Sequence, residues 1–250
     1  MYNILPASVD GTTLPSNSAG LFLQFVAPST LNLYQLSSVS FTGGTGNFAK
    51  LASLSVGAFQ EACGGSSCVP QLNTNEQLDS LGDRLMYRLA YRNFGDHESL
   101  VVNHSVQINS SSKQTGIRWY EIQNPYAIPS VKQQSTYSPD QSIYRWMGSI
   151  AQDSSGNMLL GYSTSNSSHY PGIAFTGRCS GDATNTMRTE TSILKGTGSQ
   201  TNYNRWGDYS AMAIDSSTNT FWYANEYLPS MGSFNWNTNI SSFQFGGTCN

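Results

Sequence analysis

Hydrophobic and polar residues alternate along most of this chain, which is typical of β-strands. The clearest case is Arg145–Ser163, RWMGSIAQDSSGNMLLGYS, in which two alternating segments flank the polar stretch Asp153–Asn157. Asp, Ser, Gly and Asn favour tight turns, so this segment predicts a β-hairpin. Arg205–Asn225, RWGDYSAMAIDSSTNTFWYAN, repeats the same order of residue types with a two-residue insertion. The chain therefore contains a repeated hairpin.

A third and more degenerate copy lies at Arg84–Ser105. The arginines that start the copies are 61 and 60 positions apart, so the repeat is about sixty residues long. Such a period, with four short strands in each copy, is typical of a β-propeller blade. We therefore predict an all-β fold, a single β-propeller domain of about four blades over 1–250, with the blades at approximately 1–57, 80–140, 141–196 and 203–247.

The first predicted blade is incomplete, because it holds only the strands Leu21–Val26, Leu31–Val39 and Phe48–Val56. We expect residues 1–10, another segment or another chain to complete the ring, since an open sheet edge favours association. Within Arg84–Arg92, alternation places the arginines on one face and Leu or Tyr residues on the other. This split predicts one solvated face and one packed face.

Composition narrows the classes of function. Charged residues make up only 11% of the chain and the formal net charge is -3. Because phosphate binding needs clustered Lys and Arg, we expect no nucleic-acid partner. No run of eighteen apolar residues occurs, so we also expect no membrane span. The opening MYNILPASVDG lacks the basic start and apolar core of a signal peptide, which favours a mature chain or an internal fragment.

The chain has four cysteines, and their spacing suits disulfides. Cys63 and Cys68 bracket a flexible Gly-Gly-Ser-Ser loop, and a bridge there would stabilise the fold by about 2 kcal/mol. A bridge between Cys179 and Cys249 would contribute about 4 kcal/mol. The spacing leaves the connectivity open, with four free buried thiols as the alternative. Disulfides favour a secreted, extracellular location.

The segments DRLMYRLAYRNFGDHESLVVNHSV, GIRWYEI, YRWMGSIAQDSSGNMLLGYS and RWGDYSAMAIDSSTNTFWYANEY resemble an uncharacterised family of secreted bacterial β-propeller domains, in the sialidase-like, Asp-box neighbourhood. The resemblance extends from about Leu5 onward and implies the C-terminal part of a larger propeller, or one that has lost blades. It implies a fold and a compartment rather than an activity. No Trp follows Asp153 and Gly156 as an Asp box requires, and the Phe-Arg-Ile-Pro signature of sialidases is absent.

The repeat also suggests a ligand site. In a propeller, the arginines that begin the three hairpins, Arg84, Arg145 and Arg205, would meet around the axis. Converging guanidinium groups bind a carboxylate or sulfate. Trp146 and Trp206 follow two of them and complete the candidate substrate-binding set. The alternative is structural, with each guanidinium stacked on a tryptophan and bonded to carbonyls or to an aspartate of the next blade.

Acid–base groups lie near the predicted strand ends. Glycoside hydrolases use two carboxyl groups, one with a raised pKa. The candidate catalytic residues are therefore Asp208, Tyr209 and Glu226. Outward-facing aromatic residues would stack on sugar rings, with packing between blades as the alternative role for Trp119, Tyr120, Trp146, Trp206, Trp222, Tyr223 and Trp236.

Metal sites receive weaker support. His97 and His104 lack a third clustered histidine, so zinc chemistry is disfavoured. We expect no cofactor, with a structural calcium held by turn oxygens of Asp153, Asn157 and Asp215 as the alternative.

Two hypotheses for function follow. The first is an extracellular carbohydrate-active module that binds, or as a sialidase-like glycoside hydrolase cleaves, an acidic glycan or other small anionic ligand. The second is a non-catalytic adhesion or assembly domain, in which a homo-oligomer or a partner chain completes the ring through blade edges. Fold alone does not choose between them, because propellers host many functions.

Overall fold

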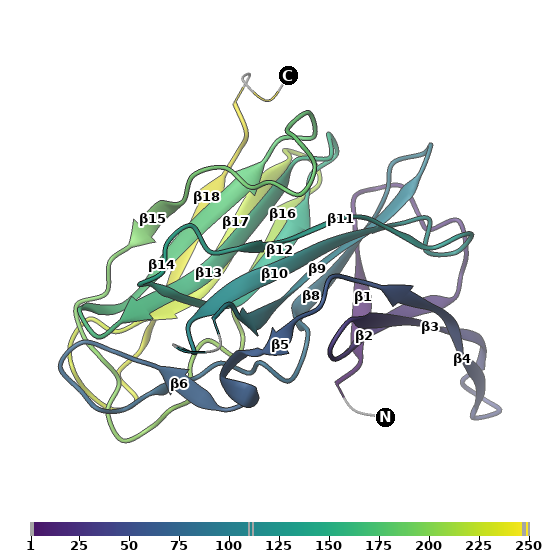
Figure 1. Cartoon of the computed structure of the whole chain (residues 1–250). Coiled ribbons are helices and arrows are strands. Elements are labelled where there is room, and N and C mark those ends of the chain that lie inside the picture. The colour runs from purple at the N-terminus through teal and green to yellow at the C-terminus, as the bar shows by residue number, and fades with distance from the viewer. Residues whose placement is uncertain (1–2, 110, 112, 247–248, 250) are drawn as a thin grey trace.

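The computed structural model describes residues 3–109, 111, 113–246 and 249, and their regular secondary structure is almost entirely β-strand (Figure 1). The all-β prediction is confirmed. The strands are β1 (Leu5–Asp10), β2 (Gly20–Val26), β3 (Thr30–Ser40), β4 (Thr45–Ser55), β5 (Gln60–Glu61), β6 (Ser67–Val69), β7 (Leu78–Asp79), β8 (Met86–Asn93), β9 (Glu98–Gln107), β10 (Thr115–Gln123), β11 (Ser130–Tyr137), β12 (Tyr144–Gln152), β13 (Met158–Asn166), β14 (His169–Arg178), β15 (Thr191–Leu194), β16 (Ala211–Asp215), β17 (Thr220–Tyr227) and β18 (Asn237–Phe243). A short 3-10 helix spans Ala62–Gly64.

Most strands form antiparallel meanders, in which consecutive strands pair. Strands β8 to β11 form one four-stranded meander and β12 to β15 form another. Strands β16 to β18 form a three-stranded sheet, named here the C-terminal sheet. Two strands predicted for the first blade, Leu21–Val26 and Leu31–Val39, lie within β2 and β3.

Strand β1 joins two of these groups into one mixed sheet. It pairs antiparallel with β2, where Leu5 faces Leu23, and parallel with β8, where Ala7 faces Leu89. The resulting strand order is β11-β10-β9-β8-β1-β2-β3-β4, with β5 added to β9. Residues 5–10 therefore supply an extra strand, but as a bridge between the first two predicted blades.

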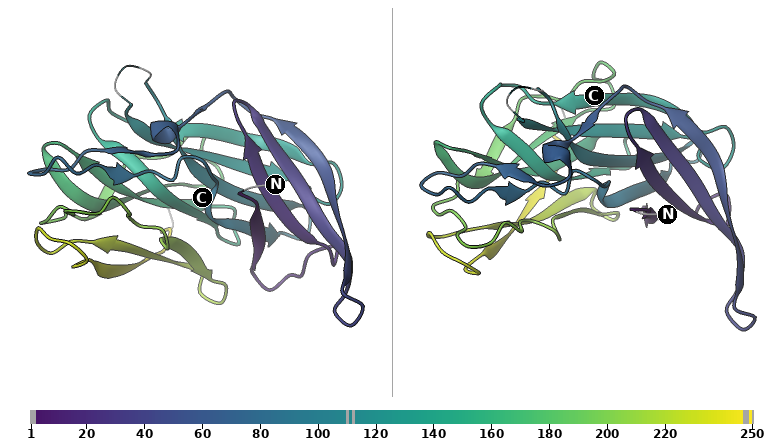
Figure 2. Two further views of the ribbon diagram at one scale, coloured as in Figure 1. Left: turned by 90° about the horizontal axis from the view of Figure 1, so that it is seen from below. Right: turned by 60° about the horizontal axis from the view of Figure 1, so that its bottom comes forward.

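The prediction of a four-bladed propeller is wrong. Propeller blades are separate sheets around an axis, whereas β1 merges the first two predicted blades through hydrogen bonds. The merged sheet curls, and β2 to β4 lie over a face of the β8 to β11 meander in a sandwich-like arrangement. Figure 2 shows β2 to β4 and the C-terminal sheet on opposite flanks of an open half-barrel. The sheets do not close into a ring.

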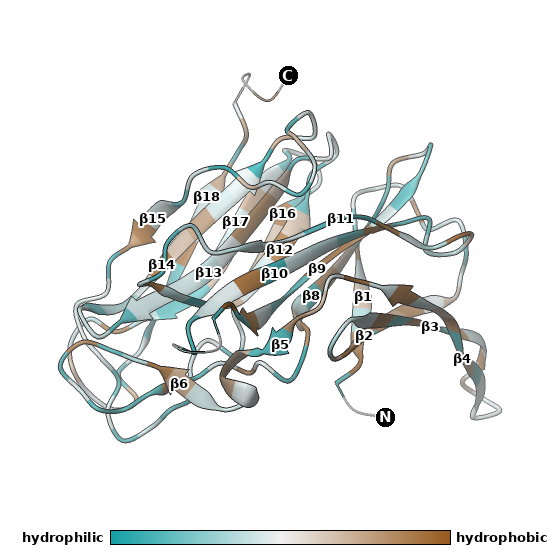
Figure 3. Cartoon of the chain, viewed as in Figure 1, coloured by the Kyte–Doolittle hydropathy of each residue, from teal (hydrophilic) through white to brown (hydrophobic). Residues whose placement is uncertain are grey.

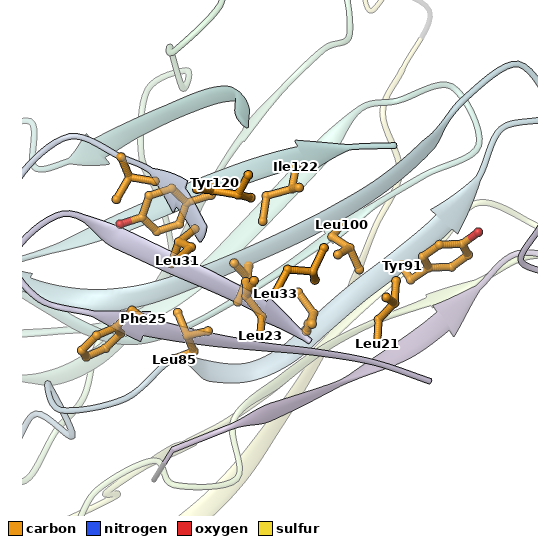
Figure 4. Close-up of a cluster of buried hydrophobic side chains, with 14 of the residues drawn as sticks. Leu21, Leu23, Phe25, Leu31, Leu33, Leu85, Tyr91, Leu100, Tyr120 and Ile122 are labelled. Atoms are coloured by element: carbon orange, nitrogen blue, oxygen red, sulfur yellow. The ribbon is translucent and has the colours of Figure 1, made fainter. Parts of the chain in front are cut away.

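The largest apolar core lies inside the curl of the mixed sheet. Leu23 and Leu33 from β2 and β3 pack against Leu89 and Leu100 from the β8 to β11 meander. Figure 4 shows Leu23 and Leu33 close to Leu100 in this core. Alternation accounts for this packing, because the side chains of a strand point to opposite faces in turn. Figure 3 shows the resulting bands of hydrophobic and hydrophilic residues across the strands.

The arginine face of β8 departs from the expectation of a solvated face. Arg88 and Arg92 are both buried, because β12 and β16 pack near that side of β8. Arg88 forms an ion pair with Asp10 and donates to Ser8 Oγ at 3.1 Å. The opposite face carries Leu89 into the core as predicted. The arginines of this strand predicted a solvent-exposed face, but the ion pair with Asp10 compensates the charge of Arg88 in the buried position.

Small residues allow the sheets to approach one another. A Cβ atom on Gly161 of β13 would lie 2.5 Å from the ring of Tyr223 on β17. A Cβ atom on Gly148 of β12 would lie 2.4 Å from Asn103 Oδ1 on β9. These glycines set the spacing between β12 to β15 and its two neighbouring sheets.

Both expected disulfides are present, Cys63–Cys68 and Cys179–Cys249. The second bridge joins Cys249, after the C-terminal sheet, to Cys179, which directly follows β14. It therefore links the segment after the C-terminal sheet to the β12 to β15 meander. No helix among the described residues has the length and apolar character needed to cross a membrane.

Candidate functional site

The three candidate arginines do not share one site. Arg84 pairs with the adjacent Asp83 at 2.8 Å, and Arg205 pairs with Asp208. The charges of Arg84 and Arg205 influence one another, so these two lie close together. Arg145 belongs to a different network. Because each guanidinium already has a carboxylate partner, their expected convergence on one anion is not found.

Arg145 is buried on β12 and held from two sides. It lies 2.6 Å from Asp140 Oδ2 and 2.6 Å from Glu190 Oε2. Tyr162 donates its hydroxyl to the same Glu190 oxygen at 2.8 Å. These bonds join β12 and β13 to the segments on either side of the meander. The structural alternative described above fits this arginine.

Trp146 and Trp206 are both buried, with ring centroids 6.2 Å apart. They belong to a core cluster with Met86 and Leu228. Trp206 Nε1 donates to Ser163 Oγ at 3.1 Å. Neither ring can stack on a ligand, but both support the loop that follows Trp206.

That loop and the C-terminal sheet bring the three candidate catalytic residues together. Tyr209 and Glu226 line one pocket of about 270 Å³, which we name the Glu226 pocket. Trp236 and Thr238 form its other side, because Glu226 on β17 faces Thr238 on β18. Asp208 lies beside the pocket, and its charge acts on Glu226.

The side chain of the preceding residue, Asn225, holds the backbone of Glu226 in place. The Asn225 side chain donates to Tyr223 Oη at 2.8 Å and to Ser163 Oγ at 3.0 Å. Its Oδ1 accepts the Glu226 backbone N–H at 2.7 Å. This fully bonded amide fixes the backbone of Glu226, so the carboxyl group emerges at a defined point of the outer sheet face.

The Glu226 carboxyl group has an unusual protonation equilibrium. Burial raises its pKa from 4.5 to about 7. A hydrogen bond from the Gly207 backbone acts in the opposite direction, and the charge of Asp208 adds to the rise. Its Oε1 atom is buried and accepts no hydrogen bond from any described residue. A carboxyl group with this pKa is partly protonated near neutral pH, so it can donate a hydrogen bond to a ligand as well as accept one.

Aromatic side chains surround this carboxyl group. Tyr209 is 94% exposed and Trp236 is 53% exposed. Trp222 and Ile240 lie further along the same outer face of the C-terminal sheet and are also exposed. Figure 2 shows no other sheet beyond this face. Among the aromatic residues proposed for sugar stacking, only Trp222 and Trp236 reach solvent, while Trp119, Tyr120, Trp146, Trp206 and Tyr223 are buried.

The arrangement suits binding better than hydrolysis. Cleavage with retention needs two carboxyl groups about 5 Å apart that face the same sugar. Glu226 lines the pocket, but Asp208 does not, since Arg205 holds one of its oxygens and the other is buried.

The candidate metal ligands serve other roles. His104 packs against Phe25 and Phe59, and burial lowers its pKa to about 3. On an exposed turn, His97 Nδ1 donates a hydrogen bond to Asp96 Oδ1 at 2.7 Å. Asp153 Oδ1 accepts the backbone N–H groups of Ser155 and Asn157, both at 2.9 Å, as a turn residue does. Within the described residues, no three His, Cys, Asp or Glu side chains gather as a metal site would require.

Some pocket residues escaped sequence analysis. Thr238 carries no motif, and its place opposite Glu226 follows only from the register of β17 and β18. Counting alternate positions along β17 from the buried Phe221 and Tyr223 would have placed Glu226 on the same face as Trp222. The partner strand could not be aligned without the structure.

No protein-family model and no curated protein matches this chain. Among solved structures, it is similar to a crystal structure of a protein of unknown function from Dyadobacter fermentans DSM 18053, with a TM-score of 0.42 and 13% sequence identity. The match covers 94% of this chain and 59% of that one, so the chain spans less than two thirds of that protein's length.

Proposed function

We propose that this chain is a carbohydrate-binding protein that takes a neutral glycan in the Glu226 pocket. The observation that carries the proposal is the pair of exposed aromatic rings, Tyr209 and Trp236, on either side of a partly buried carboxyl group. Aromatic faces pack against the C–H groups of a sugar, and a few fixed polar groups bind its hydroxyls. The two disulfides support an extracellular location for such a protein.

Charge favours a neutral sugar over the acidic glycan expected from the sequence. The charge of Asp208, and that of Glu226 whenever it is ionised, would repel a carboxylate. The nearest candidate cation, Arg205, is already paired with Asp208. A protonated Glu226 offers one donor and one acceptor to sugar hydroxyls without a net charge.

The floor beyond the pocket is suited to a chain of several sugars. Ala224 and Ile240 face one another there, and Trp222 follows on the same face. From Glu226 to Trp222 is four positions along a strand, or roughly 13 Å. That span exceeds one sugar ring, so the face would hold a linear oligosaccharide with aromatic contacts at both ends.

The test is calorimetric titration with cellohexaose, xylohexaose and mannohexaose. We expect at least one of them to bind, and Trp236→Ala to weaken that binding at least tenfold, which corresponds to about 1.4 kcal/mol. Tyr209→Ala should act in the same direction. Phe41→Ala is the matched control, because Phe41 is 95% exposed on the β3–β4 turn, outside the pocket.

Failure of all three sugars to bind at millimolar concentration would refute the proposal, as would equal binding by Trp236→Ala and wild type. The adhesion hypothesis would then be the better account of the exposed face of the C-terminal sheet. Sizing with light scattering would test that hypothesis directly.

A further inference from the structure

A second pocket of about 340 Å³, lined mostly by polar residues, lies where the β8 to β11 meander meets the β12 to β15 meander. It shares no lining residue with the Glu226 pocket. Its walls come from the β8–β9 turn, β10, β11, the β12–β13 turn and the loop that follows β14. The residues that matter below are Phe94, Glu121, Lys132, Gln133, Ser155 and Arg178. We name it the Arg178 pocket.

Arg178 is a buried cation without an ion pair. Arg178 is only 3% exposed, and no carboxylate of a described residue lies within 4.0 Å of its guanidinium nitrogens. Nε donates to the Thr186 carbonyl at 3.2 Å, and Nη2 donates to the Asp182 carbonyl at 2.8 Å. Nη1 donates to no described residue. The guanidinium is thus held in place by neutral carbonyls, and the two N–H groups of Nη1 are left for a ligand.

The carboxylates of this pocket are already occupied. Glu121 is fully buried and accepts Gln133 Nε2 at 2.5 Å and Lys132 Nζ at 3.4 Å. Asp96, at the rim, bonds the His97 ring at 2.7 Å. Burial lowers the pKa of Arg178 in spite of the charges of Glu121 and Asp182, so its positive charge is incompletely compensated.

The loop that follows Arg178 is fixed before any ligand arrives. Gln133 and Gln134 on β11 bond to Asn185 across the two meanders, through Gln133 Oε1 at 3.3 Å and the Gln134 backbone N–H at 2.9 Å. Within the loop, Asp182 and Arg188 form an ion pair at 2.8 Å. A pocket whose walls are already ordered binds a ligand with little loss of conformational entropy.

We propose that the Arg178 pocket binds a hydroxylated organic carboxylate of the sugar-acid class. Arg178 Nη1 and the ammonium group of Lys132 contact its carboxylate. Glu121 takes only one of the three N–H donors of Lys132, so the other two are available to the ligand. The hydroxyls of Ser155 and its neighbours in the β12–β13 turn face the ligand hydroxyls, and the Phe94 ring covers an apolar edge of the ligand. The proposal keeps the anionic ligand expected from the sequence but places it at residues other than the three repeated arginines.

The experiment is a calorimetric comparison of sodium glucuronate with glucose and sodium acetate. We expect glucuronate to bind, glucose to bind at least tenfold more weakly, and acetate to bind more weakly than glucuronate because it lacks hydroxyls. Lys132→Gln should weaken glucuronate binding at least tenfold. Lys50→Gln, which removes the same charge from an exposed position on β4, should leave it unchanged.

Two further variants keep the outcome decisive. Arg178→Lys retains the charge but loses the fixed Nη1 donor, so glucuronate binding should fall sharply; if this buried change prevents folding, Lys132→Gln decides alone, since Lys132 is 41% exposed. Trp236→Ala should not alter glucuronate binding, which separates this site from the Glu226 pocket. Equal affinity for glucuronate and glucose would overturn the proposal, and so would an unchanged affinity in Lys132→Gln.

Discussion

Glu226 couples the stability of the protein to pH. Its pKa is about 7 in the folded protein and near 4.5 when unfolded, so the folded state holds the extra proton between these values. The free energy of unfolding should therefore fall as pH rises from 5 to 8, by up to about 3 kcal/mol from this group. Glu226→Gln, which stays neutral, should not show this fall. Urea denaturation of both proteins at several pH values measures the difference.

Comparing the two proteins isolates Glu226 from other titrating groups. Buried His104 has a lowered pKa, so it acts in the opposite sense and lowers stability as pH falls below about 6.5. That contribution is the same in wild type and variant and cancels in the difference. Parallel pH profiles for the two proteins would show that Glu226 is ionised in the folded state at neutral pH.

Strand β12 depends on its one buried cation. Arg145 neutralises Asp140 and Glu190, and removing it would leave the Glu190 charge partly buried beside Tyr162. Breaking a buried ion pair costs about 3–5 kcal/mol. Arg145→Ala should therefore lower the melting temperature by roughly 6 to 12 °C. Binding of neutral oligosaccharide by the folded variant should be unchanged.

A loss of sugar binding at unchanged melting temperature would place Arg145 in a ligand site instead. Arg205→Ala is the comparison, because Arg205 is exposed and its ion pair with Asp208 lies at the surface. Surface pairs contribute 1 kcal/mol at most, roughly, so this variant should melt close to the wild type.

The architecture as a whole rests on covalent ties between sheets as well as on packing. Cys179–Cys249 closes a loop with a sequence separation of 70 residues. Replacing both cysteines with serine should lower the free energy of unfolding by about 4 kcal/mol, and replacing Cys63 and Cys68 by about 2 kcal/mol. Chemical denaturation of the two double variants, without reductant, gives both values. A larger loss from the short loop would contradict this loop-length argument.

Alternation and turn residues predicted the strands within each meander well, because both are local properties. They could not predict how meanders meet. Residues 5–10 carry no mark that they pair with β8 in parallel, and that pairing decides between a ring and a curled sheet. The site shows the same limit. Tyr209 and Glu226, both chosen for their places near strand ends, line one pocket, and Asp208 lies beside it. The separation of Arg145 from Arg84 and Arg205 depends on sheet packing that no spacing reveals.

The bridge formed by β1 also constrains the order in which the protein can assemble while it is being synthesised. Ala7 pairs with Leu89, which follows 82 positions later, whereas β2, β3 and β4 pair with strands that are neighbours in the sequence. Contacts so distant in sequence form slowly, because a long loop must close before they are made. Residues 7–10 thus leave the ribosome well before β8 and complete their pairing in the mixed sheet only after β8 has been synthesised.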